Sequence, residues 1–221
     1  TNITPVSSWL AFDIAVSSYD ENILWVIKAA QRASDASNGD KVYYSTDAGE
    51  NWTNITTSDL DDEYLTNIVH QRGSNGGIYI GTRRAVYYKN NSMSNFALFN
   101  NNLPLSTYST KLVPYYRGGK IRNGTNRSAY ECDFYEQTPP SAQIAADRFN
   151  ATCLDNQIQF VDHSAVSGQG TTWYWEFENG TPSTSTLRNP VVTYDMIGSH
   201  DVTLTVTDAY GTNTQTYTDF I

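Results

Sequence analysis

Four carboxylates lie close together at Asp59, Asp61, Asp62 and Glu63. Hydrolysis of a glycosidic bond needs two carboxyl groups about 5–10 Å apart, so this cluster is the first candidate for chemistry. Its neighbours are typical of a loop, and a solvated turn is the favoured interpretation. We therefore expect these carboxylates to be structural rather than catalytic.

A group of arginines that recognises a carboxylate would be a second kind of site. Arg83, Arg84 and Arg127 are the candidates, but Arg84 and Arg127 occupy equivalent positions of an internal repeat. Repetition of a residue in each unit indicates a structural role. The sequence contains no nucleophile elbow, zinc-protease motif or phosphate-binding loop. It therefore favours a chain that is not an enzyme by itself.

Oxygen ligands for a hard cation occur at Asp155, Asp162 and Asp195. Calcium prefers such oxygens, but loops rich in Asp are more often solvated turns. We predict no cofactor, and we keep these three residues as weak candidates for calcium.

Aromatic side chains that face solvent can stack on sugar rings, because the C–H faces of a pyranose are apolar. By strand alternation, one of Trp173 and Tyr174 must face away from the core, and Tyr115 and Tyr116 pose the same question. Packing between sheets or domains is the favoured interpretation. Binding of a ligand by these four residues is the alternative.

The two cysteines, Cys132 and Cys153, are too few for a disulfide scaffold and lack the spacing of a zinc site. They could form one bridge that joins two domains, or they could remain two buried thiols. The sequence leaves both alternatives open.

Composition excludes several classes of function. The chain has 221 residues, a formal net charge of −9 and 13% aromatic residues. It lacks the basic stripe that nucleic acids require, and it has no apolar run long enough to cross a bilayer. Abundant Thr, Asn, Ser and Tyr suit a secreted protein. We expect an extracellular or cell-surface protein with neither nucleic-acid binding nor membrane insertion.

The first half of the chain repeats itself about every 40–45 residues. Val42-Tyr43-Tyr44 recurs as Val86-Tyr87-Tyr88, and Gly81-Thr82 recurs as Gly124-Thr125. Strands are predicted at Leu24–Ala29, Lys41–Thr46, Asn67–Gln71, Gly77–Thr82, Ala85–Lys89, Lys111–Tyr116 and Ala129–Tyr135. A repeat of this length with four strands is typical of a β-propeller blade.

Counting strands predicts one blade at Ser8–Thr57, a second at Glu63–Leu103, and three strands of a third that end near Tyr135. A closed propeller takes about 4–8 blades, and this chain supplies about two and three-quarters. We expect the rest of a longer polypeptide, or neighbouring chains, to complete it.

The paired prolines Pro139-Pro140 predict a linker, because proline cannot continue a central strand. We place the blades at residues 1–136, the linker at 137–141 and a second domain at 142–221. In that domain apolar and polar residues alternate, as in Val202 to Thr207, which predicts a half-buried antiparallel sandwich. The expected fold class is all-β: a partial propeller plus an immunoglobulin-like β-sandwich.

The octapeptide that begins at Ser45 fits the pattern S-x-D-x-G-x-x-W, with Asp47, Gly49 and Trp52 at the defining positions. It resembles the Asp-box, or BNR repeat, of sialidase-like and sortilin-like propellers. In that family the motif forms a hairpin remote from the ligand. The resemblance implies a propeller and a structural role for these four residues.

The second domain resembles the PKD family of immunoglobulin-like modules. The matching residues are Val161-Asp162-His163-Ser164, the aromatic strand Trp173 to Phe177, Asn189-Pro190 and Val202 to Thr207. It departs from the family at Glu178-Asn179-Gly180, where Gly-Asp-Gly is commoner. The resemblance implies an extracellular module that acts as a spacer or binds polysaccharide or protein.

We therefore expect a non-catalytic C-terminal part of a large secreted or surface protein, which binds polysaccharide or protein or acts as a spacer. Two alternatives stay open. One is a fragment of a sialidase-like or xyloglucanase-like glycoside hydrolase whose catalytic residues lie upstream. The other is a subunit of an extracellular adhesin or filament, in which contacts between chains are the function.

Overall fold

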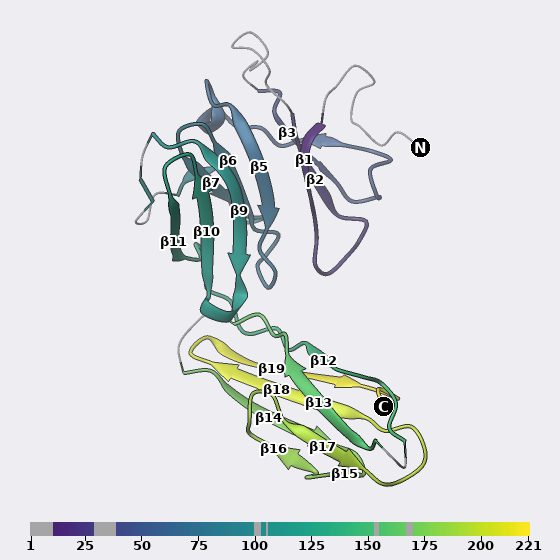
Figure 1. The fold of residues 1–221 in the computed structure, drawn as a ribbon. Coiled ribbons are helices and arrows are strands. Elements are labelled where there is room, and N and C mark those ends of the chain that lie inside the picture. Colours follow the sequence, from purple (N-terminus) through teal and green to yellow (C-terminus); the bar gives the residue numbers. More distant parts are fainter. Residues whose placement is uncertain (1–10, 29–38, 100–102, 105, 153–154, 167–169) are drawn as a thin grey trace. The chain divides into compact units, whose positions relative to one another are not determined.

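The computed structural model describes residues 11–28, 39–99, 103–104, 106–152, 155–166 and 170–221 (Figure 1). Two compact units divide the chain. The blade unit comprises Thr1–Tyr115 and Lys120–Glu136, and the sandwich unit comprises Tyr116–Gly119 and Gln137–Ile221. No helix among the described residues is long and apolar enough to cross a membrane.

The blade unit contains two four-stranded antiparallel sheets in which each strand pairs with the next one along the chain. The first comprises β1 (Ala11–Val16), β2 (Leu24–Lys28), β3 (Val42–Ser45) and β4 (Thr53–Asn54). After a single 3-10 turn at Ser58–Leu60, the second comprises β5 (Leu65–His70), β6 (Ile78–Thr82), β7 (Val86–Lys89) and β8 (Ala97–Leu98). This strand order is that of propeller blades.

A third sheet has three strands in the order β11-β10-β9. They are β9 (Ser109–Tyr115), β10 (Lys120–Thr125) and β11 (Ala129–Asp133), with a 3-10 turn at Tyr116–Gly118 after β9. Two complete blade sheets and a third with three strands agree with the count expected from the repeat.

The Gly-Thr repeat has a direct structural cause. The Thr82 hydroxyl accepts hydrogen bonds from the backbone N–H groups of Arg84 (3.1 Å) and Ala85 (2.9 Å) in the β6–β7 turn. The Thr125 hydroxyl does the same for Arg127 (3.2 Å) and Ser128 (3.1 Å) in the β10–β11 turn. Threonine recurs because its hydroxyl satisfies the backbone donors that this turn leaves unpaired.

Neighbouring sheets are joined by a second repeated contact. A carboxylate oxygen of Asp13 on β1 accepts the N–H of Ile68 on β5, at 3.0 Å. The side-chain oxygen of Asn67 on β5 accepts the N–H of Leu112 on β9, at 3.1 Å. In both strands the pairing register shifts just before the side chain that bridges. The same irregularity thus aims one polar side chain at the next sheet.

The middle sheet is covered on both faces. All five residues of β6 are buried, as are three of the four residues of β7. On one face, Ile78 and Ile80 share a core with Trp25 and Ile27 of the first sheet. On the other face, Tyr79 packs against Phe134, with ring centroids 6.4 Å apart. Burial of successive residues, rather than alternation, shows that this sheet lies between two layers.

The sandwich unit has two four-stranded sheets. The first has the order β12 (Ile144–Ala146), β13 (Gln157–Asp162), β17 (Val191–Tyr194) and β15 (Gly180–Thr181). The second has the order β16 (Thr184–Ser185), β14 (Thr172–Phe177), β18 (Val202–Asp208) and β19 (Gly211–Tyr217). Both sheets contribute to one core that includes Phe160, Trp175, Phe177 and Leu204. The all-β fold with a trailing sandwich is therefore confirmed.

An ion pair joins a fully buried carboxylate of the sandwich to a partly exposed arginine. Asp162 at the end of β13 is fully buried, and its Oδ2 atom lies 3.0 Å from Nε of Arg188. Its other oxygen accepts the N–H of Ser164 at 2.9 Å. The Asn189 side chain accepts the N–H of Asp162 at 2.9 Å. The Asn-Pro motif noted in the sequence therefore supports the backbone beside a buried charge.

Removing one partner of a buried pair leaves an uncompensated charge. We expect Arg188→Met to lower the free energy of unfolding of the sandwich by about 3 kcal/mol. Arg148→Met is the matched control, because Arg148 pairs with the exposed carboxylates of Asp147 and Asp155, and an exposed pair contributes far less to stability than a buried one. Urea unfolding curves test this, and equal costs for the two variants would contradict it.

The blade unit should lose stability in mild acid because of His70. Its ring is stacked on Trp25 with centroids 5.0 Å apart, and burial lowers its pKa below the usual 6.5. The unfolded chain therefore binds a proton more readily than the folded one. The stability that the neutral His70 ring contributes is fully present above about pH 6.5. It is lost as the pH falls from that value through the lowered pKa of the folded state.

We expect the urea midpoint of His70→Asn to depend less on pH than that of the wild type, between about pH 8 and pH 5. Carboxylates titrate equally in both proteins, so the difference between the two profiles isolates His70. Parallel profiles would show that His70 does not cause the acid sensitivity.

Candidate functional site

The clustered carboxylates divide into two kinds. Glu63 is buried, and its Oε1 atom lies 3.1 Å from Nη2 of Arg84 and 3.2 Å from the Tyr87 hydroxyl. Burial, and next the Glu63 charge, raise the pKa of Tyr87 to about 12, which makes its hydroxyl a weak nucleophile. Asp61 and Asp62 are exposed. Glu63 is thus engaged by two side chains of the second sheet and its turn.

The arginines do not form one site. The Arg83 guanidinium lies over the Tyr64 ring, 4.6 Å from its centroid, and Arg84 also donates to the Asp62 carbonyl at 3.0 Å. Arg127 belongs to the equivalent turn of the third sheet. These guanidinium groups lie in two different turns, each with its own local contacts.

The octapeptide at Ser45–Trp52 folds back on itself. The Ser45 hydroxyl accepts the N–H of Gly49 at 2.9 Å, and Asp47 accepts the N–H of Asn51 at 2.8 Å. That backbone hydrogen bond is the main reason why the pKa of Asp47 is lowered. Gly49 has a φ of 89°, and the Trp52 indole donates to the Gly49 carbonyl at 3.0 Å. These hydrogen bonds pair the backbone N–H groups of the turn, and they engage the Asp47 carboxylate within the turn.

Cys132 is buried on β11, and burial is the main reason why the pKa of its thiol is raised to about 12. Cys153 lies outside the described residues. The bridge between Cys132 and Cys153 therefore stays a prediction.

The three calcium candidates are not brought together. Asp162 pairs with Arg188, whereas Asp195 accepts the Asn156 amide at 2.6 Å. Asp155 precedes β13 and Asp162 ends it, so about 20 Å of extended chain separates them. Within the described ranges, no three His, Cys, Asp or Glu side chains form a group that could hold a metal ion.

The four candidate aromatics lie in different surroundings. Trp173 is half-buried against the sandwich core, with Arg188 4.9 Å from its ring centroid. Tyr115 lies under the Arg122 guanidinium at 3.7 Å, and it belongs to a different unit from Tyr116. Tyr174 is the one whose ring is widely open to solvent, with 44% of its surface exposed.

Tyr174 stands on the outer face of the second sandwich sheet. The buried residues of β18 alternate with Thr203, Thr205 and Thr207, and β19 faces them with threonines in register. The hydroxyl pairs Thr203–Thr216, Thr205–Thr214 and Thr207–Thr212 are hydrogen-bonded at 2.9, 2.8 and 2.8 Å. On the other side, Tyr174 pairs with Thr205, so its ring continues the middle row.

We call these nine residues the threonine face. They are Thr172, Tyr174 and Glu176 on β14, Thr203, Thr205 and Thr207 on β18, and Thr212, Thr214 and Thr216 on β19. The three strands lie side by side in Figure 1, about 4.8 Å apart, and the rows are about 6.8 Å apart.

The threonine face is polar but nearly uncharged, since Glu176 is its single charged residue. Each hydroxyl pair uses one of its two protons internally, which leaves one donor and several lone pairs for a ligand. An open aromatic ring beside such rows suits a ligand with both hydroxyl groups and apolar C–H faces.

Sequence reasoning identified Tyr174 but missed the paired threonines. The signal was present: Thr203, Thr205 and Thr207 precede Thr212, Thr214 and Thr216, with Gly211 between them. A two-residue turn between Asp208 and Gly211 puts each odd-numbered position of the first strand opposite an even-numbered position of the second, so the two sets of threonines face each other.

Comparisons with known structures return all-β proteins at low identity. YCF48 from Cyanidioschyzon merolae is 9% identical with a TM-score of 0.45, over 97% of this chain and 74% of that one. An ancestral GH74 enzyme is 15% identical with a TM-score of 0.40, over 95% of this chain and 27% of that one. The extracellular domain of a one-component system from B. thetaiotaomicron is 9% identical with a TM-score of 0.30, over 93% and 35%.

No curated protein matches the sequence of this chain. A family model does match part of it: the PKD domain, over residues 145–218. This range runs from β12 to the end of β19 and includes both sheets of the sandwich. The sandwich unit of this chain therefore contains a PKD domain.

Proposed function

We propose that this chain is a non-catalytic region of an extracellular protein, in which the PKD domain binds a neutral polysaccharide through its threonine face. PKD domains are typical of extracellular proteins. The observation that carries the proposal is the threonine face itself: three hydrogen-bonded hydroxyl pairs in register, with the open ring of Tyr174 in the middle row.

The electrostatics favour a neutral ligand. The chain carries a formal net charge of −9, and the threonine face has no cation to attract a phosphate, sulfate or uronate. Three neighbouring strands with side chains in rows match an extended glycan chain better than a coiled one. A β-linked glycan such as cellulose or chitin fits this shape, with hydroxyl groups over the threonines and a sugar ring over Tyr174.

A non-catalytic role agrees with the local contacts of the acidic and basic residues. Glu63 is engaged with Arg84 and Tyr87, and Asp47 is engaged within its own turn. The turn at Ser45–Trp52 is accordingly assigned a fold-forming role, as in an Asp-box.

The blade unit would act as the spacer. β1 leaves Ile14 and Val16 exposed by 46% and 50%, and β9 leaves Val113 exposed by 47%. These apolar residues face solvent on the first and third sheets of the blade unit. The second sheet, between them, is covered on both faces. We propose that further blades, from the same polypeptide or a neighbouring chain, cover them.

Co-sedimentation with microcrystalline cellulose and with chitin tests the binding proposal. Tyr174→Ala should weaken binding about tenfold, which corresponds to about 1.4 kcal/mol, because it removes the stacking surface. Thr205→Val keeps the shape of the face but removes a hydroxyl pair, and it should also weaken binding.

Tyr19→Ala is the control, since Tyr19 is 63% exposed in the blade unit, and it should bind as the wild type does. Failure of the wild type to sediment with either polysaccharide would refute the proposal, as would equal binding by Tyr174→Ala. Far-UV circular dichroism confirms that each variant is folded.

A further inference from the structure

The second sheet of the sandwich ends in a long open edge. Within the described residues, β18 is the sole pairing partner of β19, which is the last strand of its sheet (Figure 1). β19 has seven residues that pair with β18 without a register shift, and residues 212–216 are all exposed. The other edge strands of the sandwich, β12, β15 and β16, have three, two and two residues. β19 is therefore the one long edge of this unit.

β19 lacks the features that normally keep edge strands apart. Natural edge strands are blocked by charged residues, by proline or by bulges, or they are kept very short. The sequence of β19 is Gly-Thr-Asn-Thr-Gln-Thr-Tyr, with no charged residue and no proline. The chain as a whole carries a formal net charge of −9. β19 is thus a neutral strand at the edge of an acidic protein.

The backbone groups of β19 alternate between β18 and the open edge. The two-residue turn before Gly211 is closed by a hydrogen-bonded pair, so every second residue from Gly211 onward bonds to β18. The N–H and C=O groups of Thr212, Thr214 and Thr216 therefore point away from β18. Among the described residues, no backbone group pairs with them on that side. The Thr216 carbonyl instead accepts the side-chain amide of Gln215 at 3.2 Å.

The strand is symmetric about Thr214. On each side of it stand one amide residue and then one threonine, in the order Thr-Asn-Thr-Gln-Thr. In an antiparallel pair with a two-fold axis at Thr214, this residue meets its own copy, and Thr212 meets the partner's Thr216. The free backbone groups of these residues then lie opposite each other, and each pair of threonines exchanges two hydrogen bonds. The sequence of the edge is complementary to itself.

We propose that two copies of this chain associate through β19, in an antiparallel pair centred on Thr214. The contact is isologous, because both copies use the same residues, and it joins two four-stranded sheets into one. The threonine rows of the two copies then continue into each other on the same face. The proposal does not rest on the binding of polysaccharide, since it concerns the backbone edge of the strand.

The contact is small. Two strand backbones and short side chains bury less than the roughly 1,200–2,000 Å² of a standard stable interface. We therefore expect a weak dimer with a Kd on the order of 100 μM. At that Kd the chain is mainly monomeric at about 5 μM, and about a fifth of it stays monomeric at about 1 mM.

Amide hydrogen exchange and sedimentation equilibrium of the whole chain, without polysaccharide, test the proposal. Between about 5 μM and 1 mM, exchange of the Thr212, Thr214 and Thr216 amides should slow about fivefold, in proportion to the monomer that remains. The amides of Asn213 and Gln215 should change little, because β18 already pairs them. This alternation is the signature of a new strand at the edge.

Two variants at the axis separate the backbone from the side chain. Thr214→Pro removes the outward N–H and leaves the bonds to β18 intact, as proline on an edge strand does, so it should abolish the dimer up to about 1 mM. Thr214→Val is the matched control: it keeps the N–H and loses only the hydroxyl, and it should dimerise as the wild type does. Far-UV circular dichroism checks that both are folded.

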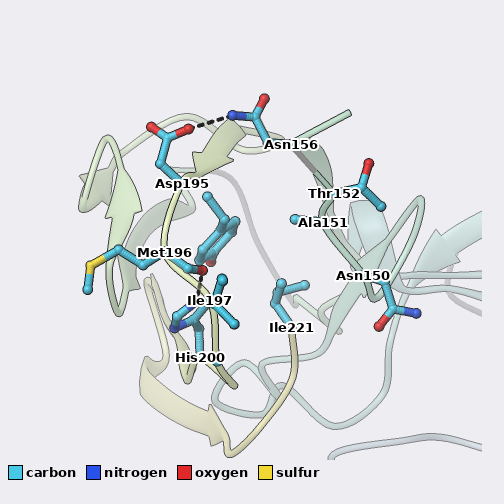
Figure 2. A pocket seen from close by; sticks show the side chains of 11 residues that line it. Asn150, Ala151, Thr152, Asn156, Asp195, Met196, Ile197, His200 and Ile221 are labelled. Atoms are coloured by element: carbon cyan, nitrogen blue, oxygen red, sulfur yellow. Dashed lines mark hydrogen bonds between the residues drawn. The ribbon is translucent and has the colours of Figure 1, made fainter. Parts of the chain in front are cut away.

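An exposed apolar patch elsewhere is the competing cause of association. Met196 and Ile197 expose 62% and 101% of their surface, and they line a pocket of about 420 Å³ (Figure 2). No residue of β19 lines this pocket. Ile197→Ser should therefore dimerise as the wild type does.

The proposal is overturned if the wild type is monomeric at about 1 mM, or if the slowed amides do not alternate along β19. It is equally overturned if Thr214→Pro dimerises as the wild type does, or if Thr214→Val or Ile197→Ser abolishes the dimer. The exchange measurement uses the wild type, so it decides the question even where the proline variant does not fold.

Discussion

Each face of a β-sheet must either be covered by another layer or be made suitable for water, and this constraint separates the two units. β6 carries an unbroken run of buried residues, because sheets lie on both sides of it. β18 alternates strictly between buried and half-exposed residues, because its inner face meets the core and its outer face does not. The first arrangement builds a stack of sheets, whereas the second leaves one face of a sheet uncovered.

The free surface is where binding can evolve without a cost to the core. Leu204 and Val206 hold the sandwich together from below, so the threonines above them can be chosen for their hydroxyl groups. Cross-strand pairing at 2.8–2.9 Å fixes the rotamers of these threonines before a ligand arrives. Such preorganisation reduces the entropy lost on binding.

Much of this architecture follows from sequence patterns. The recurrence of Gly81-Thr82 as Gly124-Thr125 predicted equivalent positions in successive blades, and the structure shows the same threonine contacts in both. β10 (Lys120–Thr125) was not among the predicted strands, because it contains Asn and Gly and depends on pairing with β9 and β11. Strands with weak local propensity are stabilised by their neighbours, which a local pattern does not describe.

The residues of the candidate site also differ in how well a local sequence pattern predicts them. Alternation from Tyr174 to Trp175 identifies the outward aromatic, since period-two patterns are local. The hydroxyl pairs of the threonine face were missed, because the pairing of two strands depends on where the turn between them falls.

Hydroxyl-radical footprinting of the free and the polysaccharide-bound chain tests the central claim most directly. Binding at the threonine face should protect Tyr174 strongly, while the fully buried Leu204 stays unreactive and exposed Tyr19 stays reactive in both states. Protection confined to the blade unit, with Tyr174 as reactive as before, would contradict the account.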